Sequence, residues 1–352
     1  MSEFDSLVAR ARKSPARIAL PEATDPRILQ AASEAAADGR CHPILIGDKS
    51  RITAKAEELS LALDGIEIID AQTSPLLSKL ASALHEKRKH KGMTEADAMN
   101  ALLEPLVFAC TLVHAGEADA CVAGAVIATA DVTRSALQIV GSAPDASFVS
   151  SFFLMNMKHD FQPLQGIMVF ADCALVVDPD AKQLSEIALQ TAISTKQLLG
   201  TNPVVAMLSF STAGSAKHQH VEKVQTATRM AEESFAITDP EWKVIGDVQL
   251  DAAVIPEILT KKAPEHAEKL KASEQTNTNG SATQLPNILI FPTLDAGNIG
   301  YKLCERFGGC DAIGPVLQGL AKPVNDLSRG CKASDVSRIL AITSLQAASA
   351  SN

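Results

Sequence analysis

Three side chains near the carboxyl end of the chain have the types needed for group transfer on a phosphorylated substrate. Ser328 and Arg329 are adjacent within the segment 323–330 (PVNDLSRG), and Asp335 follows seven residues after Ser328. An arginine side chain can bind phosphate through two parallel hydrogen bonds. A serine hydroxyl can donate to an oxyanion, and a carboxylate can accept a proton. A capped turn held by an Arg–Asp pair is the alternative interpretation.

Two segments nearer the amino end carry residues suited to anions. Residues 87–92 (KRKHKG) place Arg88 at a predicted helix end. This basic segment is either a clamp for the phosphates of a soluble cofactor or a solvent-exposed helix end. Residues 124–134 follow a buried strand and lead through small residues into a helix with Thr129 and Arg134. Exposed amide groups at such a helix start can hold an anion, and plain turn chemistry is the alternative.

Two further segments follow predicted buried strands in the second half of the chain. Residues 209–217 contain Ser211 in a hydroxyl-rich turn, and residues 295–302 contain Asn298 and Lys302. Ordinary turn chemistry is the favoured explanation of the first, because Ser and Gly are common turn residues, and Lys302 is either an anion ligand or a surface lysine. Because ligands in open α/β sheets bind beyond the carboxyl ends of strands, three such segments together favour a ligand site.

Short apolar strands alternate with helices along the chain, which predicts βαβ units and parallel sheets. Asp25 and Pro26 read as a helix cap and first helical residue, Thr94 opens a helix running towards Val113, and Ser334 caps a helix with Asp335 in its first turn. The polar segment 264–286 predicts an exposed loop. The predicted strands are 17–20, 44–46, 66–69, 120–124, 148–155, 167–177, 204–210 and 287–292, and a further amphipathic helix lies within 180–200.

Composition narrows the classes of function. The 352 residues predict two domains, and 46% hydrophobic with 21% charged residues is ordinary for a soluble protein. A net charge of −9 and 4% aromatic residues disfavour nucleic acid and acidic membranes as partners. Neither a signal peptide nor a membrane-spanning run is evident, and seven cysteines without a CxxC motif predict reduced thiols in the cytoplasm.

Several cofactor signatures are missing from the sequence. It has no GxGxxG after a strand, no GxxxxGK[ST] and no paired metal-binding aspartates, and its cysteines and histidines do not cluster at zinc-ligand spacing. We therefore expect no metal and no tightly bound cofactor.

The five segments, in this order, resemble the phosphate acetyl/butyryltransferase family over nearly the whole chain. The resemblance is densest at residues 88–94, 129–134, 291–302 and 313–330. It implies two α/β domains of the isocitrate/isopropylmalate dehydrogenase-like type with the active site in a cleft, and usually a homodimer. We place the first domain at 1–147 plus 312–352 and the second at 148–311. The insert near 273–284 and the tail after Leu345 match poorly.

The resemblance also implies a reaction, acetyl-CoA plus phosphate to acetyl phosphate plus CoA, with CoA and acetyl phosphate as substrates. By analogy Arg329 would hold the phosphoryl group, Ser328 would donate to the developing oxyanion, and Asp335 would be the base for the CoA thiol. Arg88 and Arg134 would contact CoA. The other candidate substrate-binding residues are Thr129, Ser211, Asn298 and Lys302. A phosphate butyryltransferase and a non-catalytic CoA-binding regulatory domain remain alternatives, whereas a metal-dependent dehydrogenase is disfavoured.

The proposed base has an energetic difficulty. A free thiol has a pKa of ~8.5 and a free aspartate ~3.9, so complete proton transfer to Asp335 is uphill by ~6 kcal/mol. Two solutions exist. In the first, the two pKa values approach each other, because burial raises that of the aspartate or nearby cations lower that of the thiol. In the second, the proton moves while the sulfur attacks.

Overall fold

The computed structural model describes residues 3–271 and 284–350. Contacts divide the chain into two compact units, residues 1–149 with 314–352 and residues 150–313. The central part of the predicted loop 264–286 lies outside the described residues.

The first unit is built on a five-stranded sheet in the order β11-β4-β1-β2-β3, and every recorded strand pair is parallel. Its strands are short apolar runs, because a parallel sheet covered by helices buries both faces. They are β1 (Arg17–Leu20), β2 (His42–Ile46), β3 (Glu67–Ile69), β4 (Ala120–Ala123) and β11 (Val324–Asp326).

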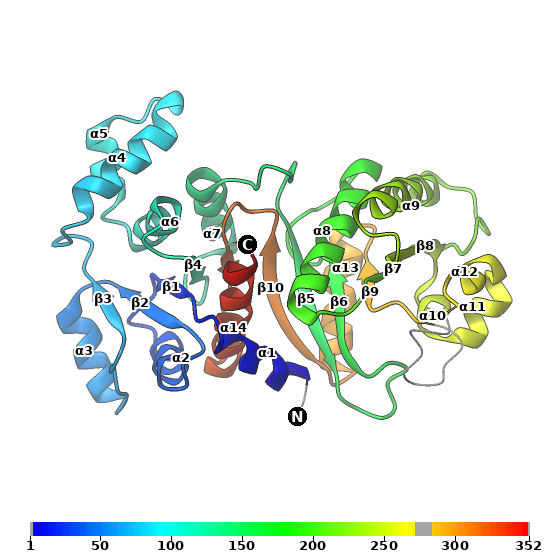
Figure 1. Cartoon of the computed structure of the whole chain (residues 1–352), viewed down its shortest axis with the longest axis horizontal. Helices are drawn as coiled ribbons and strands as arrows, with labels where there is room; N and C mark the ends of the chain where they lie inside the picture. Colours follow the sequence, from blue (N-terminus) through cyan, green and yellow to red (C-terminus); the bar gives the residue numbers. More distant parts are fainter. Residues whose placement is uncertain (1–2, 272–283, 351–352) are drawn as a thin grey trace. The chain divides into compact units, whose positions relative to one another are not determined.

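Helices cover both faces of this sheet (Figure 1). Helices α2 and α14 pack on each other and on the central strands, while α6 packs on β1, β2 and β4. The buried apolar side chains of α4, α6 and η2 form one core cluster with those of the strands. The helices are α1 (Glu3–Ala11), α2 (Pro26–Ala37), α3 (Lys49–Glu58), α4 (Leu77–Arg88), η1 (Lys89–Lys91), α5 (Glu95–Ala101), α6 (Pro105–Ala115), α7 (Thr129–Ser135), η2 (Ala136–Val140) and α14 (Ala333–Ala350).

The second unit contains a mixed sheet in the order β10-β5-β6-β9-β7-β8, in which β5 and β6 are antiparallel. Helices α8 and α9 pack together and on its strands, and the chain returns to the first unit within β10. The strands are β5 (Ser150–Met157), β6 (Gly166–Ala171), β7 (Val204–Leu208), β8 (Lys243–Val248), β9 (Ile288–Ile290) and β10 (Asp311–Gln318). The helices are α8 (Ala181–Leu199), α9 (Gln219–Thr238), α10 (Leu250–Val254), α11 (Pro256–Lys262), α12 (Pro264–Lys269) and α13 (Leu294–Arg306).

The α/β class is confirmed, and several predicted elements are wrong in detail. The strand predicted at 167–177 ends at Ala171. The helix predicted from Thr94 to Val113 is two helices, α5 and α6, because Pro105 starts a new helix where its missing N–H needs no partner. The predicted exposed loop begins with helix α12. Residues 295–302 lie within α13 and do not form a turn.

Among the described residues, no single helix has the length and apolar composition to cross a membrane. Helices α5 and α6 meet those criteria only as a pair, which is bent by 114°.

Candidate functional site

The carboxyl ends of β1, β4 and β11 lie side by side, because these strands are parallel neighbours. The chain continues from β11 into residues 327–332, the predicted catalytic turn, which leads to α14. The Leu327 N–H donates to the Ala123 carbonyl at 2.7 Å. This bond joins the end of β4 to the residue before Ser328. The structure therefore places the turn at the sheet edge where α/β proteins bind ligands.

Ser328 and Arg329 are both exposed on this turn. The Ser328 hydroxyl oxygen accepts a hydrogen bond from the Gly330 N–H at 3.3 Å, which leaves its O–H free to donate. In the described part of the chain, no carboxylate or carbonyl accepts a hydrogen bond from the Arg329 guanidinium. Its fork of donors is thus available to an anionic ligand.

Asp335 lies in the first turn of α14, and it caps the helix itself. Its Oδ2 accepts from the Lys332 N–H at 2.9 Å, and its Oδ1 lies 3.9 Å from Arg338 Nη1. The predicted cap, Ser334, is wrong because that residue is already helical. The Asp335 side chain is 40% exposed, so it is not the buried carboxyl that one solution to its proton-transfer problem requires.

The amide groups predicted to bind an anion after β4 are occupied by Glu22. Glu22 is 8% exposed, and its carboxylate accepts hydrogen bonds from the N–H groups of Ala125, Val126 and Ile127 at 2.8, 2.7 and 2.6 Å. These three amides are therefore not available to an external anion, whereas an anion site at the start of α7 itself, beginning at Thr129, stays a prediction. A carboxylate of the protein satisfies them, as a buried row of N–H groups requires.

A second buried acid, Asp326, lies at the end of β11 and is 1% exposed. The nearby Thr129 side chain favours its charged form, while its Oδ1 has no hydrogen-bond partner among the described residues. Burial raises the pKa of this carboxyl to about 6, and the nearby Glu22 charge acts in the same direction.

This pKa predicts a specific pH dependence of stability. The folded state holds the Asp326 proton to higher pH than the unfolded chain, whose aspartate pKa is ~3.9. The stabilisation is thus full below that value and is lost as pH rises through about 6. We expect the free energy of unfolding of the wild type, relative to Asp326→Asn, to fall by about 2 kcal/mol between pH 4 and pH 7. Urea unfolding of both proteins measures the difference, and a difference that does not vary with pH would contradict the assignment.

Three of the predicted substrate-binding residues lie in the first unit. Thr129 is the exposed first residue of α7 and contacts Asp326. Arg134 pairs with Asp131 at 2.6 Å on the surface of the same helix. Arg88 ends α4, and the preceding Lys87 Nζ donates to the Val140 carbonyl at 3.4 Å, so the basic segment lies beside the η2 continuation of α7.

The other three predicted ligands belong to the second unit. Ser211 is fully buried, and its hydroxyl accepts from the Ala216 N–H at 3.2 Å, so it holds its own turn together. Asn298 donates to the Cys173 carbonyl at 3.1 Å and accepts from Lys302 Nζ at 2.7 Å on the same helix. Lys302 is exposed, which leaves its remaining donors open to solvent.

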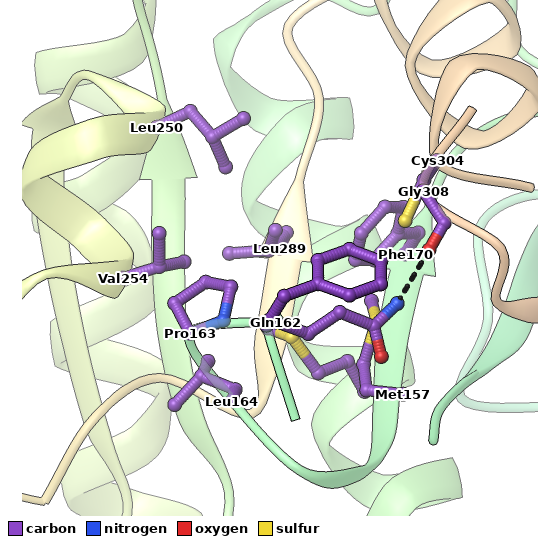
Figure 2. A pocket seen from close by; sticks show the side chains of 12 residues that line it. Met157, Gln162, Pro163, Leu164, Phe170, Leu250, Val254, Leu289, Cys304 and Gly308 are labelled. Carbon is purple, nitrogen blue, oxygen red and sulfur yellow. Dashed lines mark hydrogen bonds between the residues drawn. The ribbon is translucent and has the colours of Figure 1, made fainter. Parts of the chain in front are cut away.

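Two pockets lie away from the predicted catalytic turn. Figure 2 shows one in the second unit, of about 250 Å³, where Gln162 Nε2 donates to the Gly308 carbonyl at 2.9 Å beside apolar side chains such as Phe170 and Leu289. This lining offers no cation for a phosphate. The other pocket, of about 290 Å³, lies at the ends of β1, β2 and β3, and its lining includes Asp48, Arg51 and Asp70. Neither lining contains a predicted site residue.

No group of three or more His, Cys, Asp and Glu side chains within residues 3–271 and 284–350 is placed to hold a metal ion. Sequence reasoning overlooked the contacts of Glu22 and the burial of Asp326. Glu22 follows β1 and Asp326 ends β11, so their position at the ends of parallel strands was the available signal.

Comparison with known proteins defines the class to which this fold and site belong. The chain belongs to the family described as "Phosphate acetyl/butaryl transferase", whose model matches residues 3–344. Over 347 residues it is 43% identical to a phosphate acetyltransferase of Acetivibrio thermocellus, covering 99% of this chain and 98% of that protein.

Solved structures agree with this membership. A EutD phosphotransacetylase from Staphylococcus aureus superposes with a TM-score of 0.86 at 40% identity, covering 98% of each chain. A branched-chain phosphotransacylase from Enterococcus faecalis, with a TM-score of 0.61 and 18% identity over 94% of this chain and 99% of that one, shares the fold. The chain thus has the α/β fold of phosphotransacetylases, and a putative 4-hydroxythreonine-4-phosphate dehydrogenase from Salmonella typhimurium, with a TM-score of 0.50 and 12% identity over 94% of this chain and 99% of that one, agrees with the expected dehydrogenase-like fold class.

Proposed function

We propose that this chain catalyses reversible acetyl transfer between CoA and phosphate, acetyl-CoA plus phosphate giving acetyl phosphate plus CoA. The observation that carries the proposal is the turn after β11, just before the start of α14 with Asp335. There Ser328 and Arg329 are exposed, and the Arg329 side chain has no partner in residues 3–271 and 284–350. Relatives more than 40% identical over 98% or more of the chain are phosphate acetyltransferases.

The residues of this turn suit a direct attack by the CoA sulfur on the acetyl carbonyl. Arg329 would bind the phosphoryl group through its free fork, and Ser328 would donate to the carbonyl oxygen as charge develops there. The carbon–sulfur bond forms, the carbon–oxygen bond to phosphate breaks, and Asp335 accepts the thiol proton. Since Asp335 is 40% exposed, we infer that its proton arrives while the sulfur attacks, so that free thiolate never accumulates.

CoA binding is assigned to the neighbouring elements of the first unit. Arg88 and Arg134, at the ends of α4 and α7, would contact the phosphates of CoA, and Thr129 would bind substrate at the start of α7. Asn298 and Lys302 remain proposed substrate ligands in the second unit. Ser211 keeps only its backbone for such a role, because its hydroxyl is buried in the turn. We propose no metal or tightly bound cofactor.

The acyl group distinguishes this proposal from a phosphate butyryltransferase. Initial rates with acetyl phosphate and butyryl phosphate at equal CoA would separate them, and we expect the ratio of kcat/KM to favour acetyl phosphate. A preference for butyryl phosphate would contradict the acetyl assignment while preserving the reaction class. A non-catalytic CoA-binding domain is disfavoured, because Ser328, Arg329 and Asp335 are all present and accessible.

The variant Cys331→Ala tests whether the acetyl group is transferred through a covalent acyl-enzyme. This thiol is 9% exposed, and burial raises its pKa, with the carboxylates of Asp335, Asp25 and Glu22 acting in the same direction against Arg27. Such a thiol is a poor nucleophile. We therefore expect Cys331→Ala to retain kcat within about threefold, since a lost nucleophile costs far more. Loss of turnover with accumulation of an acyl-enzyme in the wild type would indicate covalent catalysis.

We further propose that the two units are separate domains with boundaries near 147 and 312, and that the protein is a cytoplasmic homodimer. The seven cysteines are free thiols, as a reducing compartment requires. Ile299 and Leu303 on α13 and Phe307 directly after it expose 58%, 51% and 85% of their surface, an apolar face suited to a second copy. Sedimentation equilibrium would test this, and a monomer at micromolar concentration would contradict it.

A further inference from the structure

We propose that Arg27 is a positioning residue that holds the catalytic turn after β11 against the turn after β4. This inference rests on the proposed function, because it assigns the purpose of holding Ser328 and Arg329 in place. Arg27 lies in the first turn of α2, outside every segment that suggested chemistry in the sequence.

Each N–H group of the Arg27 side chain has an acceptor. Nε donates to Asp25 Oδ1 at 2.9 Å and Nη2 donates to Asp25 Oδ2 at 2.8 Å. The remaining donors bond to backbone carbonyls, Nη2 to Ala125 at 2.7 Å and Nη1 to Arg329 at 2.8 Å and Cys331 at 3.2 Å. A guanidinium has five N–H donors, and these five bonds use them all.

This saturation separates Arg27 from a substrate ligand. Arg329 has an exposed guanidinium without a partner among the described residues, whereas Arg27 has no donor left for a phosphate. Its side chain is 28% exposed and that of Asp25 is 12% exposed, so the pair is largely screened from solvent. The Asp25 bonds favour the charged form of Arg27 and raise its pKa, which keeps all five donors in place.

The three carbonyls belong to the two turns that the proposed reaction needs. Ala125 begins the turn from β4 to α7, whose amides Glu22 holds from the other side. Arg329 and Cys331 flank Gly330 in the turn from β11 to α14. Holding the Arg329 and Cys331 carbonyls restricts the backbone on both sides of Gly330. The direction of the exposed Arg329 side chain then follows from the backbone that Arg27 fixes.

The chain contains a matched control for this arrangement. Arg40 also pairs through its guanidinium with an aspartate two residues earlier, Asp38, and it bonds the Ser337 hydroxyl within α14. Its side chain is 14% exposed, so its burial is comparable to that of Arg27. Neither of the two turns is among its partners.

Arg27→Lys and Arg40→Lys provide the test in the full-length protein. A lysine keeps the charge but has three donors on one atom, so it cannot reach carbonyls in both turns and Asp25 together. We expect both variants to lower the melting temperature. Only Arg27→Lys should lower kcat, by roughly 100-fold, because a displacement of about 1 Å costs that much. Its KM for CoA should change by less than about threefold, since the proposed CoA ligands Arg88 and Arg134 are unchanged.

Hydrogen exchange gives a readout that does not depend on turnover. Amides of residues 125–129 and 328–331 should exchange faster in Arg27→Lys than in the wild type, with no such change in Arg40→Lys. Equal kcat values for the two variants, or unchanged exchange in both segments, would overturn the positioning role. If Arg27→Lys does not fold, Asp25→Asn, which keeps the α2 cap, should show the same pattern. Wild-type protein without acetyl transfer would instead refute the proposed function.

Discussion

Arg329→Ala is expected to lower kcat by roughly a thousandfold at saturating substrates. The variant removes the only fork of donors on the catalytic turn that the described protein leaves unpaired. Removing a group that stabilises charge in the transition state costs about 10²–10³ in kcat, and a bidentate cation on phosphate belongs at the upper end. Steady-state kinetics with acetyl phosphate and CoA measure the loss. Arg329→Lys should recover only part of it, because an ammonium cannot form the fork.

Arg88→Ala is the matched comparison for this variant. Arg88 lies at the end of α4, half-buried, and is assigned to CoA binding. Its loss should raise the KM for CoA with little effect on kcat, the pattern of uniform binding. If Arg88→Ala abolished turnover at saturating CoA, the clamp assignment would be wrong. If Arg329→Ala kept normal kcat, the site itself would be wrong.

Gly124→Ala is expected to destabilise the protein by about 4 kcal/mol and to abolish turnover. Gly124 has φ +105°, and a Cβ there would lie 2.1 Å from Asp326 Oδ1 and 2.7 Å from Leu327 N. The strained backbone costs about 1–2 kcal/mol and the overpacking about 1–3 kcal/mol. Relief of the clash would displace the backbone of Leu327 and with it Ser328. Urea unfolding at constant pH measures the stability.

Gly65→Ala is a control that introduces backbone strain without a steric clash. Gly65 also has positive φ, +75°, but nothing lies within 4 Å of its added Cβ. We expect this control to cost only about 1 kcal/mol and to leave kcat unchanged. Equal destabilisation by the two variants would show that contact with Asp326 and Leu327 contributes nothing.

Much of the fold could be predicted from local signals in the sequence. Asp25 and Pro26 begin α2, and Thr94 with Asp97 forms the predicted capping box, because caps depend on residues only two or three positions apart. The helix predicted within 180–200 is α8. The break between α5 and α6 was missed although Pro105 marks it, because the apolar pattern continues through the break.

The internal contacts of the candidate site could not be predicted in the same way. Glu22 reaches amides about a hundred residues away, and Arg27 bonds to a carbonyl 302 residues away. No local pattern encodes such pairs, because they exist only after β1, β4 and β11 align. The turn amides after β4 do bind an anion, but that anion is the carboxylate of Glu22.

Asp335 illustrates how burial decides between mechanisms that the sequence leaves open. The exposed Asp335 caps its own helix, whereas the acid with the raised pKa is the buried Asp326, nine residues earlier. Residue type alone could not separate the two carboxylates, since burial depends on the packing of β11 against β4 and α7.

The decisive measurement is the formation of acetyl-CoA from acetyl phosphate and CoA, followed at the thioester absorbance for the wild type and Arg329→Ala together. We expect turnover by the wild type and its near loss in the variant, with CoA still bound by both. Absence of turnover in a folded, CoA-binding wild type would contradict the proposed function.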